Sequence, residues 1–119
     1  MWQDISSTDT ASGWIRPDSA STGVDLRRLA NGTVLNVHTC HSCYRVVVTD
    51  GPRGHVAVQG GYWFPHETPA RIDGCNGGGT SMKARWIGTG LHLEIVRDDR
   101  LRVVTSRVRS IEVTTPSSN

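Results

Sequence analysis

The fold is decided by two runs of alternating residues, TVLNVHT at 33–39 and YRVVVT at 44–49. In both runs an apolar side chain returns at every second position, which is the period of a β-strand with one buried face. Between them, CHSC at 40–43 predicts a hairpin turn that places Cys40 opposite Cys43. The apolar pairs that share the buried face are then Val37 with Val46 and Leu35 with Val48.

The same alternation continues along the chain. A dense turn signal at 50–54 leads into a third strand at 55–59, in which Val56 and Val58 face inward, so residues 33–59 predict a three-stranded meander. Further on, two prolines predict a loop at 64–70, and a second, glycine-rich loop is expected at 74–81. A long bent strand is predicted at 83–96. A turn at Asp98-Asp99 then leads to strands through 101–103 and 111–113.

Length and composition agree with strands. A chain of 119 residues fits one domain, valine outnumbers leucine by 13 to 6, and the helix formers glutamate, lysine and glutamine number only three, one and two. The sequence therefore predicts an all-β fold, a small single-domain antiparallel barrel or sandwich of five to seven strands. We expect this domain at 26–115, with one short helical turn within 24–29 and a disordered C-terminus at 116–119.

We expect residues 1–25 to form a polar, partly disordered tail or arm. Most of them are Ser, Thr, Gly, Pro or Asp, and their apolar residues follow neither a helical nor a strand periodicity. Trp2 and Trp14 do not fit a solvated segment. We expect one or both to dock on this domain or on a partner.

Charge and hydropathy restrict the class of protein. The net charge of +2 is too small to argue for nucleic acid or membrane from bulk charge. No apolar run approaches the roughly 18 residues of a membrane span, and no export signal is visible. Three cysteines form a poor disulfide framework, so we expect a cytoplasmic, reduced protein that binds no membrane.

The run HTCHSC at 38–43 is the sharpest chemical motif. Two thiols at a hairpin tip can converge on a zinc ion, and His38 or His41 could add a nitrogen ligand to Cys40 and Cys43. A fourth protein ligand could also come from His66, Cys75 or another subunit. A redox pair and an ordinary surface turn are the alternatives, and no cofactor other than zinc is expected.

Catalytic motifs are missing. GCNGGGTS at 74–81 approaches a phosphate-binding loop, but Thr80 stands where its lysine belongs and no helix is predicted to follow. No spacing selects a nucleophile with its base. We therefore expect a protein that is not an enzyme.

Two groups of side chains could bind a partner. We expect Trp63 and Phe64 either to pack in the core or to form, with Trp2 and Trp14, a protein-binding patch. The C-terminal third is basic, and its arginines either keep an outer strand face soluble or contact nucleic acid. The candidate nucleic-acid contacts are Arg85, Arg100, Arg102, Arg107 and Arg109.

These observations favour a non-enzymatic β-barrel that binds a protein partner or assembles with itself, by strand addition or by docking of a tryptophan. The alternatives are an arginine-dependent nucleic-acid-binding barrel and a zinc protein centred on the hairpin tip.

Overall fold

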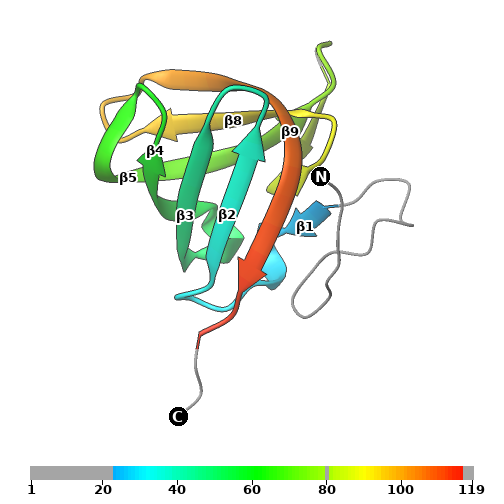
Figure 1. Ribbon diagram of the computed structural model, residues 1–119. Helices are drawn as coiled ribbons and strands as arrows, with labels where there is room; N and C mark the ends of the chain where they lie inside the picture. Colours follow the sequence, from blue (N-terminus) through cyan, green and yellow to red (C-terminus); the bar gives the residue numbers. More distant parts are fainter. Residues whose placement is uncertain (1–22, 80, 117–119) are drawn as a thin grey trace.

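A computed structural model describes residues 23–79 and 81–116 of the chain (Figure 1). Trp2 and Trp14 lie outside the described residues. Within that part, six antiparallel strands close into a barrel in the order β2-β3-β4-β5-β8-β9, with β9 pairing back onto β2. Their bounds are β2 Val34–Thr39, β3 Cys43–Asp50, β4 His55–Gly60, β5 Phe64–Asn76, β8 His92–Arg97 and β9 Arg102–Thr114. The prediction of an all-β antiparallel fold is confirmed.

Two long strands make closure possible. The first half of β5 pairs with β4 and its second half with β8, while β9 pairs first with β8 and then with β2. Figure 1 shows β2 and β3 across the front of the barrel, with β5 and β8 behind them at a steep angle. Because the ladder is closed, these six strands leave no long free edge.

Short elements complete the described part. Strand β1, Gly23–Asp25, pairs with β7, Trp86–Gly88, and β6, Met82–Ala84, extends the end of β5. Two 3-10 helices, η1 at Leu26–Arg28 and η2 at Gly51–Arg53, pack together. The single helical turn predicted within 24–29 is confirmed. Residues 23–25, however, belong to a strand rather than to a tail. No helix in the described ranges is long and apolar enough to cross a membrane.

The barrel interior is filled by the inward positions of each strand. Val46, Val48, Val56 and Val58 are buried, as the alternation predicts. Leu26 of η1 is also fully buried within the same hydrophobic core. A side chain at Gly51 would collide with the carbonyl group of Leu26, so glycine is what lets η2 approach η1 this closely.

The predicted register of the first hairpin is wrong by two residues. Leu35 lies opposite Val46, and His38, not Cys40, lies opposite Cys43. The turn is closed by Thr39, whose backbone N–H donates to the Ser42 carbonyl (2.8 Å) and whose hydroxyl oxygen accepts from the Ser42 N–H (3.0 Å). Because a shift of two preserves the strand period, every side chain keeps its predicted face.

The loop predicted at 64–70 is also wrong, since these residues form the first half of β5. Pairing skips from Gly60–Phe64 to Val58–Thr68, so Pro65 lies in an irregular stretch that needs no ladder hydrogen bond. Strand β8 pairs with β5 only from Ala70 onward, which leaves one side of the strand open at Pro69.

The long strand predicted at 83–96 is instead three strands, β6, β7 and β8. Arg85 separates the first two with a left-handed backbone (φ 56°), and a turn containing Gly90 (φ 81°) separates the last two. The predicted glycine loop is shorter than expected because residues 74–76 complete β5. The last two predicted strands are one continuous strand, β9, after the confirmed turn at 98–100.

Candidate functional site

The hairpin tip does not gather its four candidate zinc ligands. Cys40 lies in the loop and Cys43 lies opposite His38 on β2, and both thiols are free and exposed. In residues 23–79 and 81–116, no group of three or more His, Cys, Asp or Glu side chains could hold a metal ion. The loop is tied to β9 instead, through the His41 N–H to Ser106 Oγ (3.2 Å).

Cys75, considered above as a further ligand, is a core residue. Its side chain is buried, and burial raises the pKa of the thiol to about 11. A thiol held protonated in this way is neither a good nucleophile nor a good metal ligand.

Phe64 is not part of a surface patch, so its prediction as a partner-binding residue is wrong. It opens β5 on the inward side, is fully buried, and packs edge-on against Tyr44 with ring centroids 6.4 Å apart. Trp63 is 46% exposed at the β4–β5 turn and makes an edge contact with Tyr62, which is 83% exposed.

The five candidate nucleic-acid arginines differ in how far the fold already uses them. Arg102 bonds Asp73 (2.9 Å) and Glu94 (2.7 Å), Arg85 donates to the Ile72 carbonyl, and Arg107 donates to the Gly90 carbonyl. The side chains of Arg100 and Arg109 make no hydrogen bond or ion pair with a described residue. Three of the five guanidinium groups are therefore engaged within the protein.

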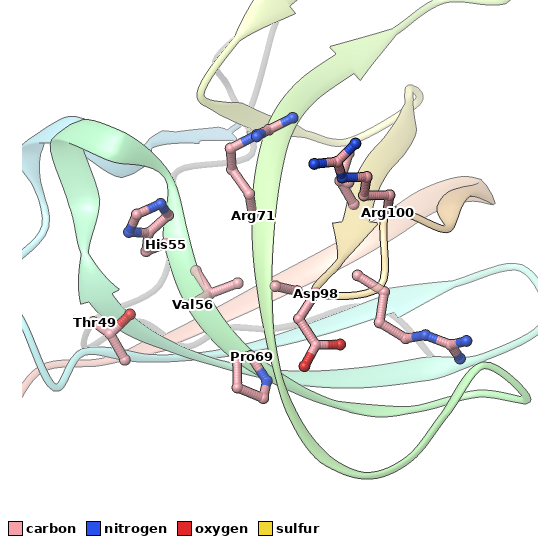
Figure 2. Close-up of a pocket in the computed structure, with 10 residues that line it drawn as sticks. Thr49, His55, Val56, Pro69, Arg71, Asp98 and Arg100 are labelled. Atoms are coloured by element: carbon pink, nitrogen blue, oxygen red, sulfur yellow. The ribbon is translucent and has the colours of Figure 1, made fainter.

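A groove of about 480 Å³ lies where the start of β4, the middle of β5 and the end of β8 meet (Figure 2). Four apolar residues line it, of which Pro69 and Val96 are accessible at the surface, while Val56 and Ala70 are buried core residues. Polar and charged side chains make up the rest of the lining. They are Thr49, His55, Arg71, Arg97, Asp98 and Arg100.

The three arginines of the groove are not equally available. Arg97 is fully occupied, since two of its nitrogens contact the Asp99 carboxylate (2.9 and 2.6 Å) and the third donates to the Trp63 carbonyl (3.0 Å). The hydrogen bonds from Arg97 lower the pKa of Asp99 to about 2. This contact also fixes the β4–β5 turn against the β8–β9 turn.

Arg71 and Arg100 have free donors. Arg71 donates through Nε to Asp73 Oδ1 (2.7 Å), and its two terminal nitrogens bond no described residue. Figure 2 shows the guanidinium groups of Arg71 and Arg100 on the same side of the groove, with His55 across from them. The groove therefore presents one free guanidinium group, that of Arg100, and the two unbonded terminal nitrogens of Arg71, whose Nε is paired with Asp73.

Arg100 holds its place at a conformational cost. In the β8–β9 turn the Arg100 N–H donates to the Arg97 carbonyl and the Arg97 N–H donates to the Leu101 carbonyl, which forces Arg100 into the left-handed region (φ 72°). Glycine or asparagine is the usual residue there, and other residues cost roughly 1–2 kcal/mol. In the sequence, the feature that could have indicated this strain is an arginine directly after Asp98-Asp99, at a turn position that glycine usually occupies. Residues that break a local rule concentrate at functional sites.

No protein-family model matches this chain, and comparisons with curated proteins and with solved structures find no match either.

Proposed function

We propose that the protein is a non-enzymatic binding module whose groove holds an acidic, partly apolar segment of a partner protein. The observation that carries this proposal is the presence in one groove of the free guanidinium group of Arg100 and the two unbonded terminal nitrogens of Arg71, beside the accessible apolar residues Pro69 and Val96.

The acidic part of the ligand follows from the chemistry of the arginines. A guanidinium group is charged at all physiological pH values and matches a carboxylate with two parallel hydrogen bonds. The Nε–H of Arg71 is already held by Asp73, so its terminal nitrogens are oriented before a ligand arrives. The residues from 23 onward carry 12 Arg and Lys against 8 Asp and Glu, which favours an anionic partner.

The apolar part of the ligand follows from the accessible apolar residues of the groove. Pro69 and Val96 offer aliphatic surface to a side chain of similar character. A groove of this volume takes a few side chains of an extended segment rather than a whole protein surface. The closed barrel has no long edge for strand addition, so we propose docking of side chains as the mode of binding.

A peptide suits the groove better than a nucleic acid does. Among the described residues that line the groove, His55 has the one aromatic ring, and none is a Phe, Tyr or Trp, the large rings on which single strands usually stack their bases. Asp98 in the groove repels any anionic group, but its carboxylate can accept a hydrogen bond from a peptide N–H, a donor that a phosphate group lacks. The free thiols accord with a cytoplasmic location, which we propose on the cysteine pattern alone.

The test uses the full chain and a labelled peptide, SELESELES, followed by fluorescence anisotropy. We expect binding that is lost with SKLKSKLKS and weakened with SESESESES, because the first reverses the charge and the second removes the apolar side chains. Arg71→Ala or Arg100→Ala should each weaken binding about fivefold, which corresponds to about 1 kcal/mol for one exposed charge pair.

Arg109→Ala is the matched control, since Arg109 is also exposed and unpaired among the described residues but lies outside the groove. An equal loss in this control would mean attraction by net charge rather than a site. Tighter binding of a single-stranded oligonucleotide, with a steep salt dependence, would favour the nucleic-acid alternative.

A further inference from the structure

Two parts of this chain carry opposite charge. Residues 1–22 contain three aspartates, Asp4, Asp9 and Asp18, against one arginine, Arg16, whereas the residues from 23 onward have an excess of four basic side chains. Charge complementarity of this kind steers one surface toward another and fixes the register of the contact.

The acidic segment also has the composition that the groove requires. In WQDI at 2–5, Asp4 is two residues after Trp2 and directly before Ile5, and in WIRPD at 14–18, Asp18 follows Trp14 and Ile15, with Arg16 and Pro17 between. Each stretch could place a carboxylate on a guanidinium group of the groove while an apolar side chain covers Pro69 and Val96. Docking in the groove would thereby explain why two tryptophans occur in an otherwise polar segment.

The segment is long enough to reach the groove of its own molecule. Residues 1–22 precede β1, and 22 extended residues span up to about 70 Å. The longest dimension of the molecule is 41 Å. A tethered segment acts at an effective concentration in the millimolar range, so weak ion pairs are sufficient for docking.

We propose that residues 1–22 dock in the groove of the same molecule and compete with the partner. This inference rests on the proposed function, because it assumes that the groove binds acidic, partly apolar segments. Docking of the segment then sets the apparent affinity for the partner, since only the undocked fraction can bind.

The test compares full-length chains. The variant Asp4→Asn/Asp9→Asn/Asp18→Asn keeps the length and the tryptophans but removes the negative charge of the segment. We expect it to bind SELESELES about threefold or more tightly than the unchanged chain. The matched control, Asp50→Asn/Glu67→Gln/Glu112→Gln, removes the same charge from residues that do not line the groove, and we expect a smaller gain.

A second measurement locates the contact. Amide chemical shifts of residues 69–71 and 96–100 should differ between the unchanged chain and the Asp4→Asn/Asp9→Asn/Asp18→Asn variant, while the Arg109 amide should not move. Unchanged affinity and shifts, with Arg71→Ala still weakening peptide binding, would overturn the inference but leave the proposed function standing.

Two other outcomes are distinguishable. If no form of the chain binds the peptide, the proposed function falls and this inference falls with it. If the competition strengthens with protein concentration and sedimentation shows dimers, the segment docks on a second copy and docking within one molecule is refuted.

Discussion

Arg100→Asn should make the protein more stable and a poorer binder at the same time. The backbone at Arg100 is left-handed, with φ 72°, and the side chain makes no hydrogen bond or ion pair with a described residue. The substitution therefore removes a conformational penalty without removing a known contact. Asparagine tolerates this region because its short polar side chain can bond locally.

The magnitude follows from the populations of the left-handed region. An ordinary residue costs roughly 1–2 kcal/mol there, and asparagine is several-fold enriched, so we expect a gain of about 1 kcal/mol. For a domain of this size, such a gain raises Tm by about 4 °C. The affinity for SELESELES should fall about fivefold, as for any loss of the Arg100 guanidinium group.

Thermal unfolding followed by circular dichroism gives the first quantity and anisotropy gives the second. Arg109→Asn is the control, because Arg109 lies in the extended strand β9, where asparagine is unfavourable and Tm should not rise. A lower Tm for Arg100→Asn would refute the assignment of strain at this turn. Unchanged affinity would refute the role of Arg100 in the groove.

Three further predictions test the fold. Val46→Asp should abolish folding, because an unpaired carboxylate in the core costs several kcal/mol, whereas Val47→Asp on the outer face should be tolerated; equal unfolding midpoints in urea would contradict this assignment of faces. An alkylating reagent at pH 8 should modify two of the three thiols in the native protein, and Cys75 only after unfolding. Because the pKa of Cys75 is raised from 9.0 to about 11 in the folded protein, the free energy of unfolding should decline as the pH rises from 9 to 11. The pKa of Asp99 is lowered from 3.8 to about 2, so its contribution to stability should be complete above pH 4 and lost as the pH falls toward 2. The variant Asp99→Asn should therefore lose less stability in acid than the unchanged protein. An unchanged slope of the urea midpoint against pH would count against the Arg97–Asp99 pair.

Alternation of side chains was sufficient to predict the fold class, because burial depends on one strand at a time. Val56 and Val58 face inward whatever their partners are. The register of the first hairpin was not predictable in this way. It depends on the hydroxyl group of Thr39, which bonds across the turn, and hydrophobic patterning does not record such bonds.

The prolines of β5 show a second limit. Pro65 and Pro69 are poor strand residues by local preference, yet the neighbouring strands leave them room because β8 pairs only from Ala70. Context of this kind exists only after the barrel has closed.

The groove was beyond sequence analysis for a similar reason. His55, Arg71 and Arg100 come from three separate elements, and no spacing along the chain brings them together. Of these, Arg100 alone was a candidate residue beforehand, and it was selected for its charge rather than for its position in a turn.

Asp98 and Arg100 depart from a pattern that recurs in this chain. Elsewhere an arginine bonds an aspartate two residues away, as Arg27 does with Asp25, Arg71 with Asp73 and Arg97 with Asp99. Asp98 and Arg100 have the same spacing, but no ion pair joins them in the described residues. A cation and an anion that are not paired with each other therefore lie in the lining of one groove, which is the arrangement that a peptide ligand with carboxylates and N–H groups can use.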